Sequence, residues 1–109
     1  MELTIRTRTD GEYTVVAVGG EIDMFTATEL REALHAELAK NVSRLAIDVN
    51  GVEFCDSTGL GVIIGVLRRL RESGGKLVIV CARQQMLKIF QLTGLDTVLD
   101  IRAELPADG

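Results

Sequence analysis

The chain has 109 residues, a length that fits one domain and leaves no room for a second. Hydrophobic residues make up 47% and charged residues 26%, values that exclude a disordered chain and indicate a globular protein with its own core. The formal net charge is −4, with one Tyr, three Phe and no Trp, so the basic patch and the stacking side chains of a nucleic-acid-binding protein are missing.

The sequence also argues against a membrane protein and a metalloprotein. Its longest run without charged or strongly polar side chains, residues 59–67, is far shorter than the roughly 20 residues of a membrane span. No positive segment followed by an apolar one opens the chain, so we expect no signal peptide and a cytoplasmic protein. Cys55, Cys81 and the single His35 are too few for a disulfide framework or a zinc site, and we expect two inert buried thiols, no metal and no cofactor.

The first elements are predicted to form a hairpin. Residues 3–8 alternate apolar and polar side chains, which is the period of a half-buried strand. Asp10-Gly11 is a strong turn signal, and residues 13–18 are β-branched and apolar, which predicts an antiparallel partner strand. We expect Gly19-Gly20 to end this second strand.

A helix is predicted next, over residues 27–40. Thr26 and Glu29 have the spacing of a capping box, in which a hydroxyl and a carboxylate each accept a hydrogen bond from a backbone N–H at the helix start. Apolar residues recur behind them at helical spacing and form one buried stripe. Residues 45–49 then predict a short strand, after which Asn50-Gly51 is expected to turn the chain.

A second helix is predicted from Ser57 to about Ser73. Either Asp56 or Ser57 fits its N-cap position, and a capping serine would make Ser57→Ala cost about 1 kcal/mol. Besides its core stripe, this helix carries a second stripe of small uncharged residues: Thr58, Gly61, Val62, Gly65 and Val66. Such a stripe either packs on a neighbouring helix or stays exposed to dock a partner, and the sequence leaves both interpretations open.

The rest of the chain continues the alternation of strands and helices. Residues 77–81 predict a strand covered on both faces, residues 84–93 a third helix, and residues 98–101 a last short strand. Connections of this length favour parallel pairing with right-handed crossovers.

The expected fold class is therefore α/β. We predict a single domain over residues 1–109, built as a mixed β-sheet with a leading antiparallel hairpin and helices packed against it. Residues 3–101 are expected to be the ordered core, and residues 102–109 a frayed tail.

Ser57 is the main candidate for chemistry. A hydrolase elbow needs Gly-x-Ser-x-Gly, but the sequence here is Cys-Asp-Ser-Thr-Gly, and the one histidine, His35, lies in another helix. A hydroxyl at a helix N-terminus is a favourable place for a phosphate, because free N–H groups and the helix dipole attract an anion there. We therefore expect a modification site at Ser57 and no catalytic residue.

Four segments, in this order, resemble the landmarks of one family. Gly20-Glu21-Ile22-Asp23 looks like its loop before the first helix, and Asp56-Ser57-Thr58-Gly59-Leu60-Gly61 resembles the signature around its phosphorylated serine. Gly75 with residues 77–81, and then Leu92-Thr93-Gly94-Leu95, resemble the landmarks downstream. On these motifs the chain, over about residues 3–101, is similar to the bacterial anti-sigma factor antagonists of the STAS-domain family.

The resemblance implies a protein switch and not an enzyme. In that family, the unphosphorylated antagonist binds an anti-sigma factor with serine kinase activity and so frees the sigma factor. The kinase then phosphorylates the signature serine, here Ser57, and a phosphatase resets the protein. Thr58 stands where many members have a second serine, so it is a second candidate hydroxyl. With the docking interpretation of the second stripe, the expected partner-binding residues are Asp23, Asp56, Ser57, Thr58, Gly59, Val62 and Val66.

An alternative is an accessory STAS interaction domain. Such a domain docks on a transporter ATPase or a signalling scaffold and has no phosphorylation cycle. The two interpretations differ in whether Ser57 accepts phosphate from a kinase.

Overall fold

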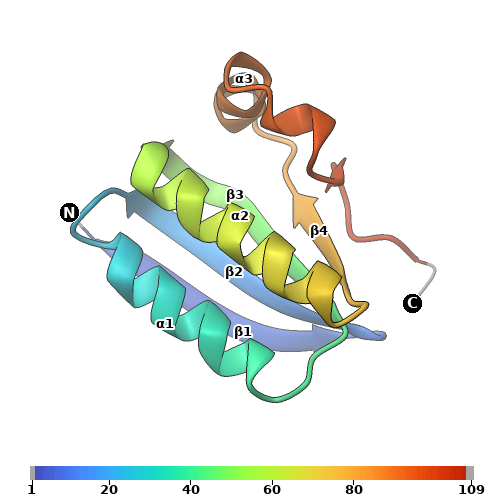
Figure 1. The fold of residues 1–109 in the computed structure, drawn as a ribbon. Coiled ribbons are helices and arrows are strands. Elements are labelled where there is room, and N and C mark those ends of the chain that lie inside the picture. The colour runs from blue at the N-terminus through green and yellow to red at the C-terminus, as the bar shows by residue number, and fades with distance from the viewer. Residues whose placement is uncertain (1, 108–109) are drawn as a thin grey trace.

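The computed structural model describes residues 2–107, which contain the elements labelled in Figure 1. In chain order they are β1 (Leu3–Asp10), β2 (Tyr13–Ile22), α1 (Ala27–Leu38), β3 (Arg44–Cys55), α2 (Ser57–Glu72), β4 (Lys76–Val80), α3 (Gln84–Leu92), the short 3₁₀ helix η1 (Leu95–Thr97) and β5 (Ile101–Arg102). The prediction of a second helix that begins at Ser57 is confirmed.

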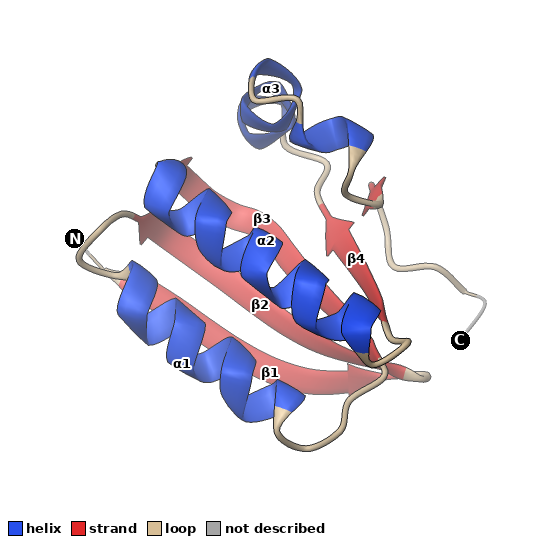
Figure 2. Cartoon of the chain, in the orientation of Figure 1, coloured by secondary structure: helices blue, strands red, loops and turns tan. Residues whose placement is uncertain are grey.

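The strands form one sheet in the order β1-β2-β3-β4-β5. β1 pairs antiparallel with β2, while β2–β3, β3–β4 and β4–β5 pair in parallel, so the predicted mixed sheet with a leading hairpin is confirmed. Figure 2 shows α1 and α2 side by side on one face of the sheet, with α3 set apart from them near the ends of β3 and β4.

Two predicted chain breaks are wrong. Gly19-Gly20 and Asn50-Gly51 lie inside strands, because β2 continues to Ile22 and β3 to Cys55. Gly19 pairs with Gly51, and a Cβ on Gly51 would stand 3.1 Å from the Gly19 Cα, so the two glycines allow a close backbone approach. Register shifts on both sides of this pair bend the strands, which then reach the end of the sheet where α1 and α2 begin.

The main core lies between the sheet and the α1–α2 layer. Leu30 and Leu34 of α1 and Ile63 of α2 have no exposed surface, and they pack in one cluster with the inward side chains of β2, β3 and β4. Helix α2 touches α1 as well as β3 and β4, so two of its faces are covered.

A smaller cluster lies on the opposite face of the sheet, because successive strand residues point to opposite faces. It consists of Tyr13, Val15, Ala46, Val78 and Val80, with Leu105 packed against it. Leu105 is partly buried, so the segment expected to fray is held against the sheet at this residue, and residues 108 and 109 lie outside the described part. The last strand is residues 101–102 and not 98–101, because the N–H groups of Val98 and Leu99 bond back to the Leu95 carbonyl at the end of η1.

Candidate functional site

Ser57 is the first residue of α2, and the residue before it caps the helix. The Asp56 backbone is extended, and its Oδ1 accepts a hydrogen bond of 3.1 Å from the Gly59 N–H. The cap is therefore Asp56 and not Ser57. The Ser57 side chain is exposed, so the loss of about 1 kcal/mol expected for a capping serine does not apply to Ser57→Ala.

The loop between β2 and α1 is held by hydrogen bonds centred on Asp23. Its Oδ1 accepts from the backbone N–H groups of Phe25 at 2.9 Å and Thr26 at 3.0 Å. The Thr26 hydroxyl accepts from the Asp23 N–H at 2.9 Å and donates to the Glu21 carbonyl at 2.8 Å. The predicted capping box of Thr26 and Glu29 is wrong, because the Thr26 hydroxyl bonds back to the end of β2 and caps no helical N–H.

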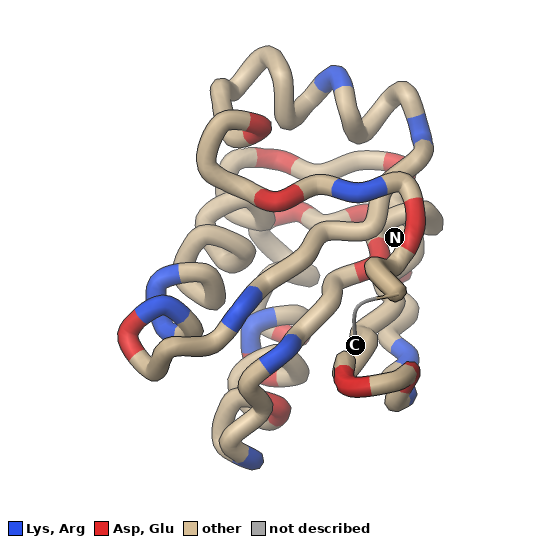
Figure 3. The backbone as a smooth tube through the Cα atoms, turned by 90° about the vertical axis from the view of Figure 1, so that its right-hand side faces the viewer, with Lys and Arg blue, Asp and Glu red and all other residues tan. Residues whose placement is uncertain are grey.

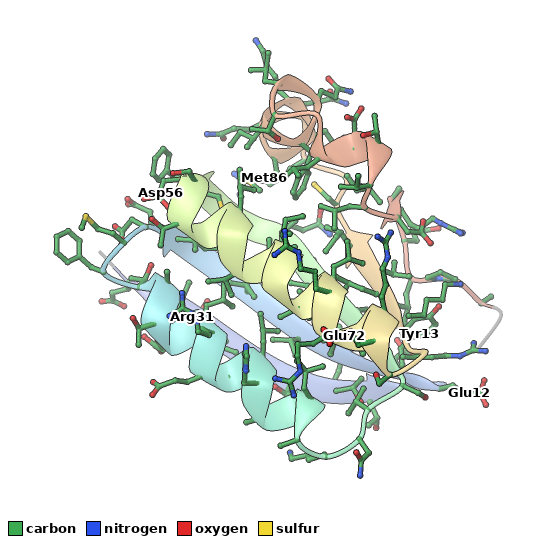
Figure 4. All side chains as sticks on the ribbon, viewed as in Figure 1. Glu12, Tyr13, Arg31, Asp56, Glu72 and Met86 are labelled. Carbon is green, nitrogen blue, oxygen red and sulfur yellow. The ribbon has the colours of Figure 1, made fainter. Side chains whose placement is uncertain are left out.

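Strand pairing places this loop beside Ser57. Ile22 pairs with Cys55, and the Asp56 N–H donates to the Ile22 carbonyl at 3.0 Å. The loop after β2 and the first turn of α2 therefore leave the sheet from neighbouring backbones, at the end marked by Asp56 in Figure 4. The predicted site residues Asp23, Asp56, Ser57 and Thr58 thus lie at one end of the molecule.

Three other predicted partner-binding residues lie inside the fold. Val62 is 5% exposed and Val66 fully buried, and both belong to the main core. Gly59 is buried where a Cβ would meet the side chains of Ile22 and Cys55. The structure buries Val62 and Val66 of the second stripe and leaves Thr58 and Gly61 exposed, so we assign no direct partner contact to Val62 or Val66.

The pKa of Asp23 is lowered from its ordinary value of 3.8. The main cause is the hydrogen bond from the Thr26 backbone N–H; partial burial opposes it, and the Phe25 N–H adds to it. The charged form is therefore the one that holds the loop. Since the folded-state pKa lies below that of the unfolded chain, this group stabilises the fold fully at pH values well above 3.8, and the contribution is lost as the pH falls through the folded-state pKa.

Asp23→Asn is expected to reduce the pH dependence of stability. The amide oxygen can still accept the two backbone hydrogen bonds, but it does not titrate, so the free energy of unfolding should fall less steeply between about pH 5 and pH 2 than in the wild type. Urea titrations across this range measure the slope. Asp10→Asn, at an exposed carboxylate in the hairpin, is the control for removal of one acidic group. Identical slopes for Asp23→Asn and the wild type would contradict the role of Asp23.

The site contains apolar side chains that sequence analysis missed. Met24 and Phe25 lie in the loop held by Asp23, and Phe54 precedes Cys55 at the end of β3, and all three are exposed. The available signal was the pair of large apolar residues in a segment predicted to be a loop, where burial is not the default.

The hydrolase interpretation finds no support in the geometry. His35 lies eight residues beyond the start of α1, which places it about 12 Å along the helix from the end that holds Ser57. Cys55 and Cys81 are free and buried; burial, with a smaller effect from Asp56, raises the pKa of Cys55 to about 12, and burial also raises that of Cys81. Both thiols therefore stay protonated and poorly nucleophilic.

Neither a metal-binding cluster nor a membrane-spanning helix is found among residues 2–107. These residues hold no cluster of three or more His, Cys, Asp or Glu side chains suited to a metal ion. The helices among them are all too short or too polar to cross a membrane.

The fold and the site define a small α/β domain with an exposed hydroxyl at a helix start. Comparison with known proteins identifies its family. Residues 5–102 match the family model described as "Mlab, STAS domain". The chain is 36% identical over 93 residues to the anti-sigma-B factor antagonist of Listeria monocytogenes, covering 85% of this chain and 82% of that protein. The chain therefore belongs to the STAS-domain family.

Solved structures agree with this assignment. An anti-sigma factor antagonist from Mycobacterium paratuberculosis superimposes with a TM-score of 0.81 at 32% identity, covering 95% of this chain and 88% of that one. The Bacillus cell fate determinant SpoIIAA in its phosphorylated form shares the fold, with a TM-score of 0.69 at 21% identity and 91% coverage of both chains.

Proposed function

We propose that this chain is a cytoplasmic anti-sigma factor antagonist that is switched by phosphorylation of Ser57. Unmodified, it binds an anti-sigma factor with serine kinase activity and so releases the sigma factor. The kinase then transfers the γ-phosphoryl group of ATP to the Ser57 Oγ, the hydroxyl loses its proton, ADP leaves, and the modified chain no longer binds. A phosphatase restores the free hydroxyl.

The observation that carries this proposal is the position of Ser57. Its side chain is exposed at the first residue of α2, beside the Asp23 loop, so a kinase can reach the hydroxyl without unfolding the helix. The names of the relatives at 32–36% identity support the role in sigma-factor control. We assign the contact surface to Asp56, Ser57, Thr58 and the backbone around Gly59. Asp23 is only 9% exposed, and it supports this surface by holding the neighbouring loop.

A phosphate on Ser57 changes the surface more than the fold. It adds a charge of about −1.5 to −2 at the positive end of the helix dipole, where an anion is tolerated or favoured. The same charge stands next to Asp56, so negative charge accumulates on the contact surface. We infer a loss of binding while the domain stays folded.

Ser57→Ala and Ser57→Asp are expected to behave in opposite ways towards the kinase. Since Ser57 does not cap the helix, both variants should unfold within about 0.5 kcal/mol of the wild type. Ser57→Ala should bind the anti-sigma kinase of the same organism as the wild type does and accept no phosphate. Ser57→Asp should bind at least about tenfold more weakly, because it fixes a charge beside Asp56.

Calorimetric binding and intact-mass analysis after addition of ATP provide the readouts. Thr58→Ala is the control for which hydroxyl is modified, since it removes the neighbouring exposed hydroxyl and should still take up one phosphate, on Ser57. Phosphate on Thr58 in place of Ser57, or equal binding by the two Ser57 variants, would refute the assignment. A chain that takes up no phosphate at all favours the alternative of an accessory STAS domain on a transporter ATPase or a scaffold.

A further inference from the structure

Large apolar side chains are exposed at the end of the sheet where Ser57 lies. Of the five that are exposed among residues 2–107, three lie at this end: Met24 at 66%, Phe25 at 82% and Phe54 at 48%. We call these three residues the apolar patch. Met24 and Phe25 follow Ile22 by two and three residues, and Phe54 precedes Cys55, the pairing partner of Ile22. The patch is thus built from the two segments that leave the sheet beside Ser57.

The backbone under the patch is held rigidly. The Phe25 N–H donates to the Asp23 carboxylate at 2.9 Å, and Phe54 pairs with Glu21 in the sheet. A large aromatic side chain on a fixed backbone loses little conformational entropy when a partner covers it, so it can contribute much to affinity. Exposed apolar groups of this size on a rigid frame indicate an interaction surface, because water leaves them readily when a partner binds.

The charged residues next to the patch in sequence are acidic. Residues 20–30 and 51–60, which enter and leave this end of the sheet, contain no Lys or Arg. On the α3 side, Arg83 donates to the Val52 carbonyl at 3.1 Å. Figure 3 marks the acidic and basic positions along the backbone. Glu21, Glu53 and Asp56 flank the patch in sequence. A complementary surface is therefore apolar at its centre and carries Lys or Arg at its rim.

We propose that Met24, Phe25 and Phe54 are the anchors of the complex with the anti-sigma kinase, and that they insert into an apolar surface of the kinase bordered by basic side chains. This inference rests on the proposed function and names the contact chemistry of the same site. It also explains why one phosphate suffices to break the complex. A dianion on Ser57 would have to lose its water at an interface with apolar anchors. It would also face the nucleotide phosphates that the kinase must hold opposite the Ser57 hydroxyl.

The anchors are tested by Phe25→Ser and Phe54→Thr, measured against the kinase that phosphorylates Ser57. Each variant should raise the dissociation constant by about thirty-fold or more, the loss typical of an aromatic hot spot. Thermal melting should change little, since both side chains are exposed and threonine suits a strand. Leu92→Ser is the matched control, because Leu92 is 77% exposed in α3 and lies outside the patch, and it should bind as the wild type does.

Salt dependence tests the basic rim. Association of the wild type should slow as salt is raised from about 50 to 500 mM, and Glu53→Gln should associate more slowly at low salt and depend less on salt. Binding by both Phe variants within threefold of the wild type, with Ser57→Asp still defective, would overturn the anchors and leave the proposed function intact. An equal loss in Leu92→Ser would overturn them as well. A wild type that neither binds the kinase nor takes up phosphate removes the proposed function, and this inference with it.

Discussion

Val62→Glu is expected to destabilise the domain by at least about 3 kcal/mol, the cost of placing an unpaired charge in a core. Val62 is 5% exposed and belongs to the cluster under α1 and α2, so a glutamate there either loses its water or pushes the helices apart. For a domain of this size the midpoint of thermal unfolding should fall by more than about 10 °C. Circular dichroism during heating measures the shift.

Gly61→Glu is the matched control for this change. Gly61 is the preceding residue of α2 and is exposed, and a Cβ at this position meets no atom within 4 Å. The same charge should therefore be tolerated there, and it lies near the positive end of the helix dipole. A Val62→Glu variant that melts like the wild type would mean that the second stripe faces solvent, and would return Val62 and Val66 to the contact surface.

The fold could be predicted where the local sequence pattern favours the same element that strand pairing produces in the structure. The Asp10-Gly11 turn and the apolar segment at 77–81 each predict the element that forms there. The predicted chain breaks at Gly19-Gly20 and Asn50-Gly51 were wrong, because glycine is favoured both in turns and where two strands approach closely. The local sequence does not distinguish these two cases. The strands continue through these positions because Gly19 of β2 pairs with Gly51 of β3. This pairing joins residues far apart in the chain, so local sequence patterns do not reveal it.

The candidate site was predictable in its polar part. Ser57, Asp56 and Asp23 are read from helix-start chemistry and from the family resemblance, and the structure places them together. The role of the second stripe of α2 was left open, because periodicity shows that a helix face is apolar and does not show what covers it. Phe25 was missed because it lies in a loop. A loop has no regular spacing of side chains from which their exposure could be predicted.

Gly59→Ala is expected to destabilise the domain by about 1–3 kcal/mol, the usual effect of an added carbon atom in a packed interior. A Cβ on Gly59 would stand 2.7 Å from the Cys55 Sγ and closer still to the Ile22 side chain. Because Gly59 also donates to the Asp56 cap, the strain falls on the turn that presents Ser57. The first turn of α2 can approach the ends of β2 and β3 only without a side chain at this position.

The same substitution at Gly61 isolates this contact from helix propensity. Nothing lies within 4 Å of a Cβ on Gly61, so Gly61→Ala should stabilise the domain by up to about 1 kcal/mol, the gain that alanine brings over glycine inside a helix. A double-mutant cycle identifies the atoms responsible: Cys55→Ala removes the sulfur, so Gly59→Ala should cost less in that background than in the wild type. Urea denaturation of the variants gives each free energy. If Gly59→Ala and Gly61→Ala shift stability equally and in the same direction, the tight contact of α2 with Ile22 and Cys55 is not what selects glycine next to the Ser57 site.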